Sequence, residues 1–171
     1  MNRICIVAVD IRSVHNVGSL LRTADGFNAE VILCGISPRP KKLENEDRLP
    51  HVIEKAHTAI SKTALGAENT VKTSYFKTAS GAIDYLKDES YKVYALEQSN
   101  KSKSILELNP VGNTAILVGP EVEGVSDKII NMCDGIYEIP MNGEKESFNV
   151  SVAAGIALYQ ARMHDFKNMI K

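Results

Sequence analysis

The chain has 171 residues, of which 44% are apolar and 24% charged, a composition typical of one globular domain rather than a disordered or fibrous protein. Its 20 Lys and Arg nearly balance its 21 Asp and Glu, which argues against a protein that holds nucleic acid by bulk charge. The cysteines, Cys5, Cys34 and Cys133, lack metal-site spacing, and no apolar stretch approaches the length of a membrane span. We therefore expect buried, reduced thiols, no metal and a cytoplasmic protein.

Short apolar runs alternate with helical patterns along the whole chain. Strands are predicted at residues 4–9, 31–34, 71–76, 93–96, 115–118 and 136–139. Helices are predicted at residues 17–27, 52–65, 79–86 and 127–132, and from 151 to about 170. The proline-containing segment 36–50 is predicted to be a long surface loop. Strands that alternate with helices indicate a parallel sheet covered on both faces, in one domain over residues 1–171.

In such sheets ligands bind at the carboxyl ends of the strands, which directs attention to three loops. The first follows Val9 and leads into a helix. Asn16 could cap that helix, and Gly18 would allow close approach of another backbone. Arg22 falls in an otherwise apolar helix face, so it either pairs with a neighbouring acid or offers a fork to phosphate. Spacing alone leaves both interpretations open.

The second loop runs from Gly119 to Ser126, directly after an apolar strand. Its glycines would let a ligand approach the backbone, and Glu121 could accept a hydrogen bond from an amine or a hydroxyl. Ser126 is expected to cap the helix that follows. Neither of the two glycine-rich phosphate-binding patterns occurs in the chain, which weighs against nicotinamide dehydrogenases and P-loop enzymes.

The third loop begins with Ile139, at the end of the last strand, and runs into the last helix. Ser147 and Asn149 stand just before that helix, where small polar side chains commonly cap the first turn. A cap explains one of these residues. It does not explain the whole run of specific residues from Ile139 to Ala157.

Taken together, the three loops resemble those of the SpoU (TrmH-type) branch of the SPOUT RNA methyltransferases. The resemblance extends from about residue 4 to about residue 160, and the order and separation of all three motifs agree. The matching residues are Asn16, Gly18 and Arg22; Gly119, Glu121 and Gly124; and Ile139, Pro140, Met141, Gly143, Ser147, Asn149, Ser151, Val152 and Ala153.

The resemblance implies a mostly parallel six-stranded sheet flanked by helices, with a deep trefoil knot in its C-terminal part (the SPOUT fold). It also implies a homodimer that uses S-adenosylmethionine to methylate a ribose 2′-hydroxyl of RNA, with tRNA favoured over rRNA. The implied catalytic residues are Asn16, Arg22, Glu121, Ser147 and Asn149. The implied cofactor-binding residues are Leu96, Gly119, Ile139, Met141, Ser147 and Phe148.

Two residues depart from the family pattern: Pro120 replaces the usual Asn, and Phe148 replaces the usual Leu. Proline removes a backbone donor from the second loop. The chain is also expected to lack the appended RNA-binding domain of larger relatives. RNA would then be recognised by the dimer surface and by the loop 36–50.

Alternatives to this function remain open from the sequence. One is a non-catalytic RNA- or nucleotide-binding protein that keeps the knotted fold, and another is an rRNA substrate. The last helix is apolar over a broad face, which could pack in the core, pair two subunits, or do both.

Overall fold

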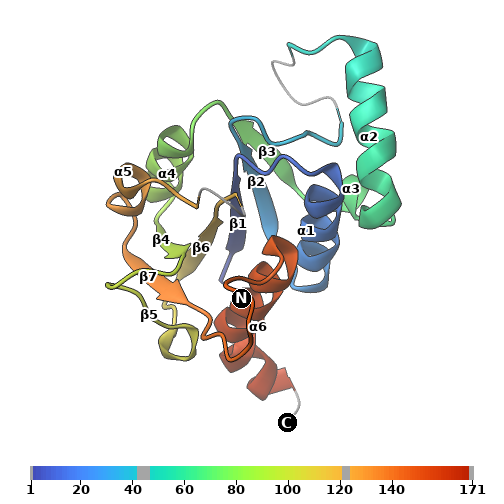
Figure 1. Cartoon of the computed structure of the whole chain (residues 1–171). Coiled ribbons are helices and arrows are strands. Elements are labelled where there is room, and N and C mark those ends of the chain that lie inside the picture. The colour runs from blue at the N-terminus through green and yellow to red at the C-terminus, as the bar shows by residue number, and fades with distance from the viewer. Residues whose placement is uncertain (1, 42–46, 121–123, 170–171) are drawn as a thin grey trace.

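The computed structural model describes residues 2–41, 47–120 and 124–169 (Figure 1). A seven-stranded sheet has the order β3-β2-β1-β6-β4-β7-β5, and all its neighbouring strands are parallel. The strands are β1 (Ile4–Val9), β2 (Glu30–Cys34), β3 (Thr73–Phe76), β4 (Tyr91–Leu96), β5 (Lys103–Ser104), β6 (Asn113–Val118) and β7 (Gly135–Glu138). The helices are α1 (Val14–Gly26), α2 (Pro50–Ala64), α3 (Ala67–Thr70), α4 (Ala79–Asp88), α5 (Asp127–Ile130), α6 (Val150–Met169) and the 3₁₀ turn η1 (Ile105–Glu107). The predicted α/β class with a parallel, helix-covered sheet is confirmed.

Two apolar cores lie on the two faces of the sheet, because successive side chains of a strand point to opposite sides. On β1, Ile4, Ile6 and Ala8 pack with residues of α1 and α6. Cys5, Val7 and Val9 pack instead with residues of α4. This inner strand, β1, is therefore apolar at every position, as expected for a parallel sheet buried on both faces.

The sheet has seven strands where six were expected. The additional strand, β5, is only two residues long and pairs with β7 at the edge of the sheet. Lys103 is exposed and Ser104 is polar, so the segment has none of the apolar character by which strands are recognised in a sequence.

The cap of α1 also differs from the expectation. Asn16 lies inside the first turn, and Ser13 is the N-cap, accepting a hydrogen bond from the Asn16 backbone N–H at 3.3 Å.

The close approach of another backbone that was expected at Gly18 is present. A Cβ atom there would overlap the Thr63 hydroxyl and the Ile60 carbonyl oxygen, so glycine allows α2 to lie directly against α1.

The thiols are less uniform than expected. Cys5 and Cys34 are buried, whereas Cys133 is only half-buried. Burial raises the pKa of Cys34 to about 12 and that of Cys133 to about 11, so both are protonated at neutral pH.

Within the described part of the chain, none of the helices combines the length and apolar character that a membrane crossing requires.

Arg162 joins the last helix to two earlier parts of the chain. Its side chain is 3% exposed, and its guanidinium donates to the carbonyl oxygens of Asn2 at 2.8 Å and of Phe27 and Asn28 at 3.3 Å. The arginine thereby satisfies carbonyl groups at the start of β1 and in the turn before β2.

We expect Arg162→Met to lower the free energy of unfolding by about 2–4 kcal/mol, because it removes the hydrogen bonds by which a buried guanidinium ties α6 to Asn2, Phe27 and Asn28. Chemical denaturation followed by circular dichroism measures this. Arg3→Met is the matched control, since it removes an exposed ion pair with Glu89 and should leave the midpoint almost unchanged. Equal effects of the two substitutions would contradict the structural role of Arg162.

Candidate active site

A cavity of about 330 Å³ lies at the carboxyl ends of β4, β6 and β7, where the sequence rule for parallel sheets places ligands. Its walls come from the ends of these strands, from the second and third loops and from the start of α6. The lining residues are Leu96, Glu97, Gln98, Val118, Gly119, Pro120, Gly124, Glu138, Ile139, Met141, Glu146, Ser147, Phe148, Val150 and Ala153.

All six residues that the resemblance assigned to cofactor binding line this cavity. Leu96, Gly119 and Ile139 stand at the ends of three adjacent strands, and Met141, Ser147 and Phe148 belong to the third loop. The sequence analysis missed Glu97 and Gln98, which also line it. The rule about strand ends, applied to β4 as it was to β1, β6 and β7, would have found them.

Glycine shapes the wall formed by the second loop. A Cβ atom on Gly119 would overlap the Val125 side chain and lie 3.0 Å from Glu97 Oε1. Gly124 has a φ of +64°, which favours glycine, and its N–H donates to the Pro120 carbonyl at 3.1 Å. Pro120 and Gly124 are thus joined by a backbone hydrogen bond, and the wall presents backbone rather than side chain at Gly119.

The carboxylate of Glu97 fixes this loop to β4. Its Oε1 accepts a hydrogen bond from the Val125 N–H at 2.9 Å. Burial raises the pKa of Glu97, and the hydrogen bond from Val125 opposes that shift. The half-buried carboxyl group of Glu97 is thus held at the wall of the cavity by its hydrogen bond to the Val125 backbone.

Three further hydrogen bonds hold the third loop. Gln98 Nε2 donates to the Glu146 carbonyl at 2.7 Å. Asn149 caps α6, because its Oδ1 accepts from the backbone N–H of Ser151 at 3.0 Å. The amide Nδ2 of Asn149 donates to Asn16 Oδ1 at 3.0 Å, so the first and third motifs meet within one chain.

Among the described catalytic candidates, Arg22 does not line the cavity. Arg22 was expected in an apolar helix face, but it is exposed on α1 beside the buried residues Leu21 and Ala24. It forms no ion pair with any residue that the structure describes, so the salt-bridge interpretation has no support there. Glu121 lies outside the described residues. The single chain thus brings Ser147 to the cavity, joins Asn16 to Asn149 and leaves Arg22 facing outward.

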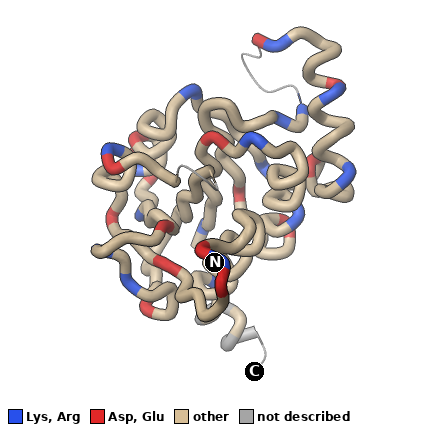
Figure 2. The backbone as a smooth tube through the Cα atoms, viewed as in Figure 1, with Lys and Arg blue, Asp and Glu red and all other residues tan. Residues whose placement is uncertain are grey.

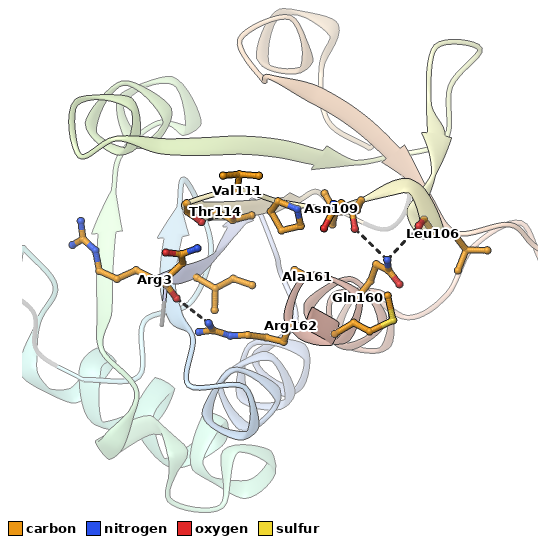
Figure 3. A pocket seen from close by; sticks show the side chains of 14 residues that line it. Arg3, Leu106, Asn109, Val111, Thr114, Gln160, Ala161 and Arg162 are labelled. Carbon is orange, nitrogen blue, oxygen red and sulfur yellow. Dashed lines mark hydrogen bonds between the residues drawn. The ribbon is translucent and has the colours of Figure 1, made fainter. Parts of the chain in front are cut away.

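A larger cavity, of about 530 Å³, lies at the opposite end of the molecule, at the amino ends of β1 and β6 (Figure 3). Figure 3 shows Gln160 and Arg162 extending into it from α6. Their donors are already engaged by backbone carbonyls, since Gln160 Nε2 donates to Leu106 and Leu108 and Arg162 donates to Asn2. This cavity lies where the two cores end, and its polar side chains serve the fold.

The cavity at the carboxyl ends has apolar walls, glycine backbone and a few convergent polar groups, which are features typical of a small-molecule site in an α/β protein. Comparison with known proteins identifies the family to which the chain belongs. The family model described as the SpoU rRNA Methylase family matches residues 3–159, and the chain belongs to that family.

Individual relatives agree with this assignment. A tRNA (guanosine(18)-2′-O)-methyltransferase of Borreliella burgdorferi is 30% identical over 99% of this chain and 70% of its own length. A 23S rRNA (guanosine-2′-O-)-methyltransferase of Coxiella burnetii is 29% identical over 89% of this chain, which spans only 55% of that protein. An AdoMet-bound rRNA methyltransferase from Sinorhizobium meliloti has a similar crystal structure, with a TM-score of 0.79 and 20% sequence identity. The match covers 96% of this chain and 57% of that one. That similarity establishes the fold.

Proposed function

We propose that this protein methylates a ribose 2′-hydroxyl of RNA with S-adenosylmethionine as the methyl donor. The observation that carries the proposal is the single cavity at the carboxyl ends of β4, β6 and β7, around which all the cofactor residues expected from the family motifs lie. Membership of a methyltransferase family supports it from the sequence side.

The residues around the cavity fit the proposed cofactor. Apolar side chains of Leu96, Ile139 and Phe148 offer surface for an adenine ring. Glycine at position 119 lets Val125 and Glu97 pack directly against the backbone of the cavity wall, where a Cβ atom would overlap them. Phe148 replaces a smaller family residue and still lines the cavity, and Pro120 retains a role as a hydrogen-bond acceptor.

When bound, S-adenosylmethionine supplies an electrophilic methyl group, and the chain must bring a ribose oxygen to it and assist loss of the hydroxyl proton. We assign to Arg22 the binding of an RNA phosphate and the stabilisation of charge that develops on the ribose oxygen. Asn149, held by Asn16, and Ser147 would orient the ribose. Glu121 completes the proposed catalytic set.

The site would be completed by a second copy of the chain. α6 divides into two sides: Ala154, Ala157 and Leu158 are buried in the core, whereas Val152 is 49% and Tyr159 57% exposed. Because these two exposed residues are seven apart, they lie on one face of the helix. Pairing of two chains through this face would account for the apolar surface and could bring Arg22 of one subunit to the cavity of the other.

Sedimentation velocity at micromolar concentration is expected to show a dimer. Val152→Glu with Tyr159→Glu should shift it to a monomer, because charges would then be buried without partners. Tyr85→Glu, which alters a 45% exposed side chain on α4 at the opposite face of the sheet, is the matched control and should stay dimeric. A monomeric wild-type protein would contradict the homodimer.

We infer that the C-terminal part is knotted. The segments that follow β4, β6 and β7 surround one cavity, and the segment after β7 continues into α6, which packs beside α1. We also propose that residues 1–171 act as one methyltransferase domain in the cytoplasm.

RNA would be contacted in part by the loop after β2, at the same edge of the sheet as the first loop. Arg48 donates to the carbonyls of Arg39 and Lys41, and the Arg39 guanidinium lies 4.1 Å from the ring centre of Tyr75. Basic residues occur here and at many other places along the chain, interspersed with acidic ones (Figure 2). A local basic group rather than bulk charge would bind phosphate.

Transfer of radiolabelled methyl groups to unmodified tRNA and, separately, to rRNA tests the function. We expect incorporation into tRNA as 2′-O-methylnucleotide. Incorporation into rRNA alone would identify the alternative substrate. Cofactor binding without transfer to any RNA would instead favour a non-catalytic RNA- or nucleotide-binding protein.

A further inference from the structure

Acidic side chains line the candidate cofactor cavity. Glu97 at the end of β4, Glu138 on β7 and Glu146 in the third loop all contribute to its walls. Neither lysine nor arginine occurs among the described residues that line it. The balance of charge at this site is thus strongly negative, although the chain as a whole is nearly neutral.

The fold places the backbones of two of these residues, Glu97 and Glu138, on neighbouring strands. β4 and β7 pair in parallel with Leu96 opposite Tyr137, and the pairing continues as the Glu97 N–H donates to the Tyr137 carbonyl at 2.9 Å. Glu97 and Glu138 therefore occupy corresponding positions at the carboxyl ends of two neighbouring strands. The Glu138 carboxylate accepts a hydrogen bond from the Ser102 hydroxyl.

Glu97 is the most firmly fixed of the three. Its Oε1 is bonded to the Val125 N–H, and it fits between Gly119 and Gly124, where added Cβ atoms would lie 3.0 and 3.4 Å from its oxygens. It is half-buried, whereas Glu146 is exposed. A charge in that position is less screened by water and acts more strongly on an occupant of the cavity.

This matters because the proposed donor and its product differ in charge. S-Adenosylmethionine carries a sulfonium, an ammonium and a carboxylate group, and is a net cation. Transfer of the methyl group turns the sulfonium into a thioether, so S-adenosylhomocysteine is neutral overall. A carboxylate close to the ligand therefore stabilises the donor complex more than the product complex.

We propose that Glu97, supported by Glu138 and Glu146, makes the cavity select its cofactor by charge, holding cationic S-adenosylmethionine more tightly than neutral S-adenosylhomocysteine. This rests on the proposed methyltransferase function. Its consequence is release of the product in exchange for fresh donor, with weak product inhibition.

The test measures binding of both molecules to the full chain by titration calorimetry. Glu97→Gln removes the charge and keeps an oxygen that can accept from Val125. The dissociation constant for S-adenosylmethionine is expected to rise about tenfold, while that for S-adenosylhomocysteine changes less than about twofold. Added salt should weaken binding of the first and not of the second. Glu107→Gln, an exposed substitution in η1, is the control and should alter neither.

Equal weakening of both ligands by Glu97→Gln, or no change for either, would overturn charge selection. Methyl transfer by the wild-type protein would still stand in that case, so the proposed function would survive. A wild-type protein that binds neither molecule would instead remove the proposed function and the inference with it. If Glu97→Gln does not fold, Glu146→Gln in the exposed loop should give the same selective loss on a smaller scale, and equal loss for both ligands would again overturn the proposal.

Discussion

Replacing Arg22 with alanine is expected to lower kcat for RNA methylation by about a hundred- to a thousandfold while leaving the affinity for S-adenosylmethionine unchanged. The physical reason is that Arg22 is exposed on α1 and does not line the cavity, so its proposed partners are RNA and the reacting oxygen. Arg22→Lys should recover only part of the rate, because it keeps the charge but loses the planar fork of donors.

Single-turnover methylation and cofactor titration together measure the effect, with Arg3→Ala as an exposed arginine control. Mixed dimers test from which subunit Arg22 acts. Equal mixing of Arg22→Ala subunits with subunits whose cavity is blocked should restore about a quarter of wild-type activity, because half of the dimers then contain one intact site. Absence of any recovery would show that Arg22 acts within its own subunit or not at all.

Gly119→Ala is expected to weaken S-adenosylmethionine binding by about a hundredfold or more, since the new methyl group overpacks the cavity wall. It would overlap Val125 and crowd Glu97 Oε1, so the second loop must shift. Titration calorimetry measures the loss, and circular dichroism checks that the sheet remains folded.

Gly143→Ala provides the matched control for this substitution. Gly143 belongs to the third loop of the same site, but an added Cβ there meets no atom within 4 Å. Its binding of S-adenosylmethionine should stay close to that of the wild-type protein. Comparable losses at the two glycines would mean that loop flexibility, rather than space at Gly119, determines affinity.

Much of the fold could be predicted from the sequence because the apolar residues of the buried strands stand in continuous runs. Apolar strands such as β1 and β6 are buried on both faces and read as continuous apolar runs. β5 could not be predicted in the same way. Its two polar residues form a strand only because β7 offers an unpaired edge, and that edge is created by tertiary structure.

The candidate site stays a prediction, although its residues can be compared with the geometry. Motif spacing identified the strand ends and the glycines, and the structure brings the cofactor candidates together. Local spacing could not reveal that Ser13 rather than Asn16 caps α1, nor that the amide of Asn16 would bond to Asn149 far along the chain. The exposure of Arg22 was missed because a helical pattern gives the phase of a buried face only approximately.

The contacts of Arg162 also bear on how the protein folds during synthesis. The carbonyl groups of Asn2, Phe27 and Asn28 receive their donors from a residue made more than a hundred positions later. Until α6 has left the ribosome, β1 and the turn before β2 lack these partners, and the helix-covered core beside them is unfilled. The N-terminal half therefore cannot reach its final stability before α6 has emerged, and completion of this core waits for the last helix.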